Sequence, residues 1–133
     1  MNNLEKVLKS MSLEFFGSGK HKISPSAHFS EKDSLFLDVR SNEEFNTLSF
    51  GLLYHVPVIH IPICEISERI NEIPKNKLVG VFCSSGVRST MVYLYLRGMG
   101  YDNVRILEGG YLEIANEFKP GKLLKYLANK EDK

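Results

Sequence analysis

The residues most able to do covalent chemistry lie in residues 78–90. A short apolar run, Leu78–Phe82, has the composition of a buried strand and is followed at once by Cys83. From Ser89 onward apolar residues recur every three or four positions, which predicts a helix. A cysteine between a strand and a helix N-terminus faces backbone N–H groups and the positive end of the helix dipole, and both stabilise a thiolate. Cys83 is therefore the candidate catalytic nucleophile.

The loop after Cys83 contains the residue types that an anion site needs. Gly86 permits a tight turn, Arg88 adds a cation, and serine hydroxyls donate hydrogen bonds to an anionic sulfur or substrate. A cysteine near a helix N-terminus and a cation has a pKa of about 3.5–7.5, below the ordinary value of about 8.5. A buried structural cysteine is the alternative, but the polar residues and glycine that follow favour a functional one. We expect the substrate to be bound by the residues that follow the cysteine, Ser84, Ser85, Gly86, Val87, Arg88 and Ser89.

Four motifs together resemble those of the rhodanese-like family. Cys83–Ser89 is similar to the family's active-site loop, Cys-x-x-Gly-x-Arg-Ser, and residues 37–45 resemble its opening motif. Residues 55–62 resemble its His-Ile-Pro…Ile-Pro segment, and residues 107–111 resemble its closing motif. The motifs also occur in the family's order. The resemblance covers residues 23–118 and leaves both ends of the chain to be interpreted without it.

The resemblance implies a sulfurtransferase without a metal or an organic cofactor. In that reaction the Cys83 thiolate takes the outer sulfur of a small anionic donor such as thiosulfate, and sulfite leaves. The resulting persulfide passes to a thiophilic acceptor such as cyanide or a protein thiol. Two other functions stay open for such a chain: a non-catalytic rhodanese-like module that binds a protein partner, and a dedicated persulfide carrier.

Phosphatases and arsenate reductases resemble this family in fold and are a further alternative. They hold phosphate or arsenate in a Cys-x5-Arg cradle, whereas Cys83 and Arg88 form Cys-x4-Arg. The shorter loop has room for the terminal sulfur of a persulfide and is too tight for a phosphoryl group. A phosphatase also needs a general acid, and the spacing places neither Asp38 nor Glu108 in that role. We therefore expect negligible phosphatase and arsenate reductase activity.

The elements that position this loop alternate between strands and helices. Apolar runs predict strands near residues 35–37, 56–62, 78–82 and 104–107. The resemblance implies a further edge strand at Ile23. Short connections between them imply an α/β fold. We expect an open parallel sheet of about five strands with helices on both faces and extra N- and C-terminal helices.

Local signals place helices between these strands. Ser24 is an N-cap with Pro25 at the first helical position, and Ser41 begins a capping box. Isoleucines at helical spacing predict one helix over Ile63–Ile73, and Cys64 is expected to help this helix to pack on the domain. A resolving-thiol role for Cys64 stays an alternative.

Both ends of the chain extend beyond the resemblance. Residues 3–12 predict a one-faced helix, and residues 15–19 with their two glycines are expected to break it. Phe15 and Phe16 are expected to anchor the segment to the core. An exposed aromatic pair that binds a partner is the alternative. The chain is thus interpreted as one rhodanese-like domain (1–133), with a core at 23–118, an N-terminal extension at 1–19 and a C-terminal helix at 120–133.

Asp38 and Arg40 directly follow one of the predicted strands. A carboxylate at the carboxyl end of a parallel strand is a candidate catalytic group. In rhodanese-like proteins the corresponding pair ties strand ends to neighbouring loops, and most paired charges are structural. We therefore expect Asp38 and Arg40 to support the structure.

The histidines and cysteines form no metal-binding pattern. His55, His60, Cys64 and Cys83 are suitable zinc ligands, but their spacing matches no zinc motif. No third group selects a cysteine–histidine pair of the protease type. We expect His55 to make a structural hydrogen bond before Pro57 and the other histidines to lie on the surface.

Composition excludes several classes of protein. With 17 basic and 16 acidic residues the chain is nearly neutral, which argues against nucleic acid as the main partner. No apolar run approaches the roughly 18 residues of a membrane span, and the first residues contain no signal-peptide core. Two cysteines form neither a disulfide framework nor a CxxC pair, which suits the reducing cytoplasm. The length of 133 residues predicts one soluble globular domain.

Overall fold

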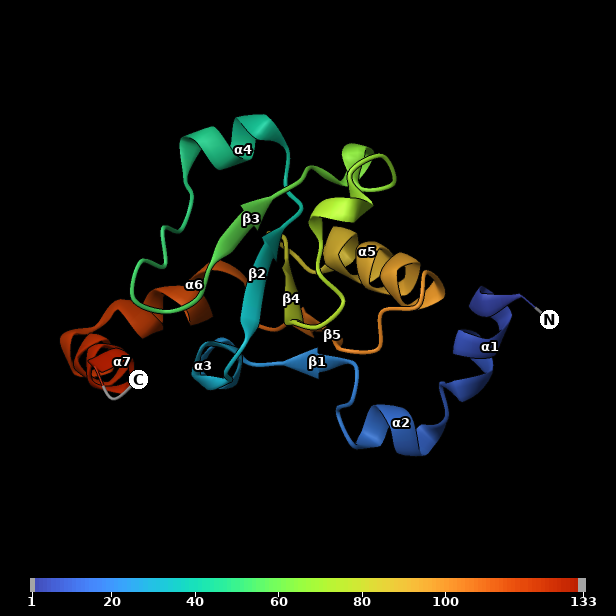
Figure 1. Ribbon diagram of the computed structural model, residues 1–133, viewed down its shortest axis with the longest axis horizontal. Coiled ribbons are helices and arrows are strands. Elements are labelled where there is room, and N and C mark those ends of the chain that lie inside the picture. The colour runs from blue at the N-terminus through green and yellow to red at the C-terminus, as the bar shows by residue number, and fades with distance from the viewer. Residues whose placement is uncertain (1, 132–133) are drawn as a thin grey trace.

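A computed structural model describes residues 2–131 (Figure 1). Its strands form one five-stranded sheet in the order β1-β5-β4-β2-β3, and every neighbouring pair is parallel. The predicted α/β fold with a parallel sheet is thereby confirmed. The strands are β1 (Lys22–Ile23), β2 (Ser34–Asp38), β3 (Val58–His60), β4 (Leu78–Phe82) and β5 (Val104–Leu107).

Helices occupy the connections and both ends of the chain. The α-helices are α1 (Asn3–Ser10), α2 (Leu13–Gly17), α3 (Pro25–Ser30), α4 (Asn42–Thr47), α5 (Val87–Gly98), α6 (Gly110–Ala115) and α7 (Pro120–Glu131). Three short 3-10 helices are η1 (Ile63–Glu65), η2 (Ile70–Glu72) and η3 (Asn116–Phe118). The last two residues of the helix predicted at 120–133, and the first residue of the 1–19 extension, lie outside the described residues.

Side chains of the central strands alternate between the two faces of the sheet. Leu37 and Val81 belong to a core cluster with residues of α5, whereas Phe36 and Phe82 belong to a second cluster with residues of α3, α6 and α7. Figure 1 shows α5 and α1 on one side of the sheet and α6 and α7 on the other. Because both faces are covered, every residue of β2 is buried.

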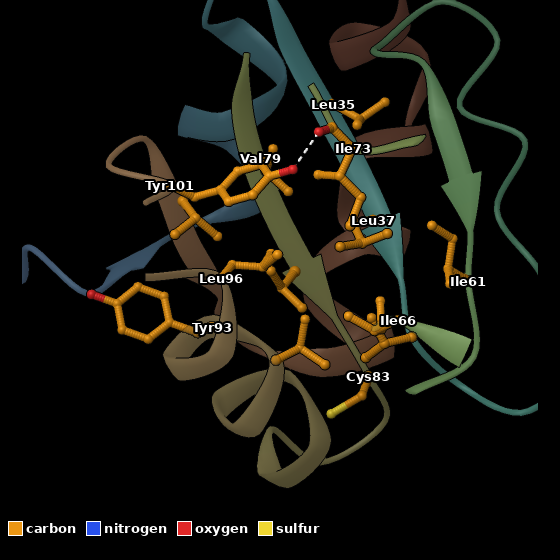
Figure 2. Close-up of a cluster of buried hydrophobic side chains, with 14 residues drawn as sticks. Leu35, Leu37, Ile61, Ile66, Ile73, Val79, Cys83, Tyr93, Leu96 and Tyr101 are labelled. Carbon is orange, nitrogen blue, oxygen red and sulfur yellow. Dashed lines mark hydrogen bonds between the residues drawn. The ribbon is translucent and has the colours of Figure 1, made fainter. Parts of the chain in front are cut away.

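Cys83 belongs to the cluster on the α5 face. It directly follows β4, so the alternation of that strand assigns it to the same face as Val81. Figure 2 shows Cys83 beside Ile66 at the edge of the cluster, with its sulfur pointing away from the other labelled side chains. The residue is 3% exposed. Core packing therefore holds the sulfur at the carboxyl end of the sheet.

The two predicted N-caps are both present. Ser24 Oγ accepts the N–H of Ala27 at 3.2 Å, with Pro25 in the first turn of α3. At α4 the Ser41 hydroxyl accepts the N–H of Glu44, and the Glu44 carboxylate accepts the N–H of Ser41, each at 3.2 Å. This capping box fixes the direction of the Glu44 side chain.

The segment between β3 and β4 differs from the prediction. It contains η1 and η2 in place of one α-helix. The Arg69 N–H is shared between the carbonyls of Glu65 and Ile66, at 3.1 and 3.2 Å, so the α-helical pattern is not continued. An apolar residue at every third or fourth position also suits 3-10 turns, in which residues i and i+3 share a face. Cys64 lies in η1 and is exposed, so the expectation that it helps a helix to pack is wrong.

The N-terminal extension contains a second helix where a break was expected. The Ser12 hydroxyl accepts the N–H of Phe15 at 3.2 Å and thereby starts α2. Phe15 packs partly buried against the α5-face cluster, whereas Phe16 is exposed. Only one of the two phenylalanines therefore anchors the segment. Among residues 2–131, no helix combines the length and the apolar surface needed to cross a membrane.

The histidines divide into buried and partly buried residues. His28 is fully buried, so the prediction of surface histidines is wrong for it. Its Nε2–H lies 3.1 Å from the carbonyl of Leu35 and 3.2 Å from that of Leu78, and thus links two adjacent strands. Gly80 makes room for the ring, since a Cβ there would lie 2.8 Å from it. His55 makes the predicted structural hydrogen bond, 3.0 Å from the carbonyl of Glu117.

Candidate active site

Hydrogen-bond donors of the following loop surround the sulfur of Cys83. The N–H groups of Gly86 and Ser89 lie 3.1 and 3.3 Å from Sγ, and the Ser89 hydroxyl oxygen lies 3.4 Å away. Gly86 adopts φ +89°, a left-handed conformation that favours glycine, and it is the N-cap of α5. The loop therefore curls around the sulfur at the positive end of a 12-residue helix.

The surroundings of Cys83 favour its thiolate. Burial on its own raises the pKa of the thiol, but hydrogen bonds from the Ser89 hydroxyl and from backbone N–H groups of Ser89, Ser85 and Gly86 lower it below the ordinary value. The Ser89 hydroxyl now donates to the carbonyl of Gly86 at 3.1 Å and accepts from the thiol. On deprotonation it can rotate and donate to the sulfur.

Arg88 occupies a different position from the one expected for a cation at the thiolate. Its guanidinium forms a bidentate pair with Glu44, at 2.6 and 2.9 Å, and donates to Ser84 Oγ at 3.1 Å. Hydrogen bonds from Arg88, followed by those from Ser41, hold the pKa of Glu44 at about 2. The sequence interpretation overlooked Glu44. Its place as the last residue of a capping box within the opening motif was the available signal.

A cavity of about 390 Å³ lies beside Cys83. One wall belongs to the loop, and the other to the end of β5 and the turn before α6. The two walls approach closely at Gly110, where a Cβ would lie 3.1 Å from the carbonyl oxygen of Ser84. The lining residues are Cys83, Ser84, Ser85, Gly86, Thr90, Ile106, Leu107, Glu108, Gly109 and Gly110.

The structure brings some of the predicted site residues together and separates others. Ser84, Ser85 and Gly86 line the cavity with Cys83, and Ser89 contacts the sulfur through its N–H and its hydroxyl. The side chains of Val87 and Arg88 are not part of the lining, and Val87 is exposed. Thr90 and Glu108, which the prediction of a substrate-binding loop left out, do line the cavity.

Asp38 and Arg40 form a buried ion pair behind the site. Arg40 Nη2 donates to Asp38 Oδ2 at 2.7 Å, and Nε donates to Oδ1 at 3.0 Å. Nη1 donates to the Tyr111 hydroxyl at 3.0 Å, and the guanidinium lies 5.2 Å from the Phe82 ring centre. The pair thus joins the ends of β2 and β4 to α6. Within residues 2–131, no three His, Cys, Asp or Glu side chains gather to hold a metal ion.

Most of the chain is similar to known proteins. The family model for the rhodanese-like domain matches residues 26–117. A sulfurtransferase of Allochromatium vinosum is 34% identical over 89 residues, which are 67% of this chain and 78% of the relative. A tRNA sulfurtransferase of Mannheimia succiniciproducens is 33% identical over 78 residues, or 59% of this chain. The chain spans only 16% of that relative's length.

A solved structure shows the same architecture. The rhodanese-related protein from Thermoplasma volcanium has a TM-score of 0.62 and 28% identity, and the match covers 75% of this chain and 95% of that one. The family match includes both the strand that precedes Cys83 and the turn that forms the opposite wall of the cavity. The chain belongs to the rhodanese-like domain family.

Proposed function

We propose that this protein is a sulfurtransferase that carries a sulfane sulfur on Cys83. The observation that supports this most is the arrangement of donors around one sulfur atom. Two N–H groups and a hydroxyl lie within 3.4 Å of Sγ, which also lines a cavity. Such donors stabilise negative charge on a thiolate and on a persulfide alike.

The proposed reaction consists of two displacements. In the first, the Cys83 thiolate attacks the outer sulfur of a donor such as thiosulfate, a new S–S bond forms, and the old S–S bond breaks with its electron pair on sulfite. In the second, the thiolate of an acceptor attacks the terminal sulfur of the persulfide, and the Cys83 thiolate leaves. No external oxidant or reductant is needed. Because donor and acceptor react in turn with the same residue, ping-pong kinetics follow.

The loop contributes to both steps. The N–H groups of Gly86 and Ser89 and the helix end behind them stabilise the charge that moves between the two sulfur atoms of the persulfide. Arg88 acts as a positioning residue, because its contacts with Glu44 and Ser84 tie the loop to α4.

The position of Arg88 also supports sulfur transfer over phosphate chemistry. An arginine that chelates two phosphate oxygens needs a free guanidinium directed at the nucleophile. The Arg88 guanidinium is occupied by Glu44, and its side chain does not line the cavity. A dedicated persulfide carrier uses the same first step and differs only in its acceptor, for which we propose a protein thiol.

The relatives bear on the substrate that we propose, and the two cysteines bear on the cellular compartment. The longer relatives are named for a tRNA substrate. We do not propose tRNA as a substrate of this chain, because it spans only 16% of the length of the first of these relatives. Cys64 and Cys83 are both unpaired. We propose a reducing compartment such as the cytoplasm, where a thiolate nucleophile stays available.

Sulfur transfer to cyanide and to a small thiol tests the proposal. The purified protein is supplied with thiosulfate or with cysteine persulfide, and release of thiocyanate or of hydrogen sulfide is followed. We expect turnover with at least one donor, parallel lines in the double-reciprocal plots, and complete loss in Cys83→Ser. Cys64→Ser is the matched control and should remain active. Equal turnover by wild type and Cys83→Ser would overturn the proposal.

A further inference from the structure

We infer that the site takes sulfur from donors of low charge, the small persulfides, in preference to the thiosulfate dianion. This inference rests on the proposed function, since it names the donor class for Cys83. It starts from the charges around the cavity and from the position of Arg88.

No lysine or arginine of the described chain is among the residues that line the cavity. The ionisable groups in the lining are Cys83 and Glu108. Glu108 is paired with Lys22 at 3.1 Å, so this pair adds no net positive charge. A dianion that enters the cavity therefore meets neutral hydrogen-bond donors and a carboxylate whose charge Lys22 balances.

The cation nearest in sequence to Cys83 is also neutralised. Both terminal nitrogens of Arg88 bond the Glu44 carboxylate, and the capping box with Ser41 holds that carboxylate in place. Because the pKa of Glu44 is about 2, the pair stays ionised throughout the neutral range of pH. The Arg88 guanidinium thus has its terminal nitrogens occupied, and the Glu44 carboxylate offsets the attraction of Arg88 for negative charge at Cys83.

The two donors place different demands on such a site. With thiosulfate, the thiolate attacks the outer sulfur of a dianion, sulfite leaves with two negative charges, and Cys83 keeps one charge as the persulfide anion. With a protonated persulfide R–S–SH, the thiolate attacks the terminal sulfur, R–S⁻ leaves, and Cys83 carries S–SH. Atoms and electrons balance in both reactions. Only the reaction with thiosulfate brings two further negative charges into the cavity. The lack of a cation there should therefore slow this reaction more than the reaction with a persulfide.

Single-turnover loading of Cys83 by each donor tests this inference. Thiosulfate and cysteine persulfide are compared at one pH and low ionic strength, because salt screens the effect. The second-order rate constant for thiosulfate is expected to be at least about tenfold lower in the wild type. In Glu44→Gln, which keeps a capping-box residue and frees the charge of Arg88, the thiosulfate-to-persulfide ratio should rise by about tenfold.

Control variants distinguish the loss of the carboxylate that binds Arg88 from the loss of any nearby carboxylate. Glu43→Gln removes a carboxylate from an exposed position of the same helix, and its ratio should stay within about twofold of the wild type. Glu108→Gln should also raise the thiosulfate-to-persulfide ratio. It provides the test if Glu44→Gln fails to fold. A ratio unchanged in both folded variants, or a wild type that prefers thiosulfate, would overturn the inference. Loading by neither donor would instead contradict the proposed function.

Discussion

Two carboxylate–guanidinium pairs of the same chemistry adjoin the elements that position Cys83. In the first, Asp38 and Arg40 are 1% and 0% exposed. In the second, Glu44 and Arg88 are 33% and 29% exposed. Both pairs are bidentate, with shortest distances of 2.7 and 2.6 Å. Geometry alone therefore does not distinguish them, and burial does.

Burial decides what each pair contributes. The buried pair is joined to the Tyr111 hydroxyl, so that its loss leaves polar groups without partners inside the fold. The Glu44–Arg88 pair is in contact with water, so that its contribution to stability is small and its effect on local charge is the larger one. We therefore propose that the Asp38–Arg40 pair stabilises the fold, whereas the Glu44–Arg88 pair sets the local charge near Cys83.

Removal of one guanidinium at a time gives the largest expected difference between the pairs. Arg40→Ala leaves Asp38 charged and buried, and should lower the free energy of unfolding by about 3–5 kcal/mol. Arg88→Ala should lower it by about 1 kcal/mol or less. Urea unfolding measures both. Similar losses in the two variants would contradict the distinction drawn from burial.

As the pH falls, protonation of His28 is expected to destabilise the fold before Glu44 is protonated and the Glu44–Arg88 pair is lost. Burial holds the pKa of His28 at about 4, against 6.5 for an unperturbed histidine. The unfolded chain therefore binds a proton that the folded chain does not. Stability present above pH 6.5 should be lost as the pH falls towards 4, by about 3 kcal/mol.

Urea unfolding across this range of pH measures that loss. The comparison protein is His28→Gln, which does not titrate there and should show a shallower dependence on pH. If both proteins lose the same stability, other groups account for the acid sensitivity and the assignment to His28 is wrong.

A smaller effect is expected at the sulfur itself, where hydrogen bonds and not Arg88 are the closest stabilising groups. Ser89→Ala removes the hydroxyl next to Sγ and should raise the pKa of Cys83 by about one unit, or about 1.4 kcal/mol. The pH dependence of alkylation by iodoacetamide measures the pKa. Ser85→Ala keeps its backbone N–H and should leave the pKa in place. An equal rise in the Cys83 pKa in both variants would contradict the assignment, because only the Ser89 hydroxyl lies next to Sγ.

The smallest expected difference concerns phosphatase activity, which should be absent. Because Arg88 is bound by Glu44 and the loop is Cys-x4-Arg, the wild type should hydrolyse an aryl phosphate no faster than Cys83→Ser. A release of phenol that depends on Cys83 would refute both the loop-length argument and the assignment of Arg88 as a positioning residue.

The features that the sequence predicted correctly are those fixed by neighbouring residues. The caps at Ser24 and Ser41 depend on contacts three residues apart, and the position of Cys83 follows from the strand before it and the helix after it. Alternation of buried residues then determines the face on which Cys83 lies.

The features that were missed depend on contacts between distant segments. Glu44 and Arg88 are 44 positions apart, and the direction of the Arg88 side chain is set by where α4 packs. His28 is buried because Gly80 leaves space for its ring, which no local pattern shows. The isoleucines between β3 and β4 fit an α-helix and 3-10 turns equally well, so that packing decides between them.

Mass spectrometry of the loaded protein tests the central claim most directly. The protein is treated with cysteine persulfide or thiosulfate, the excess donor is removed, and the sulfur is located by peptide mapping with and without an acceptor thiol. We predict the mass of one added sulfur atom on the Cys83 peptide, lost on addition of the acceptor, and no transferable sulfur on Cys64. A Cys83 peptide that stays unmodified with both donors, while the protein remains folded, would contradict the account.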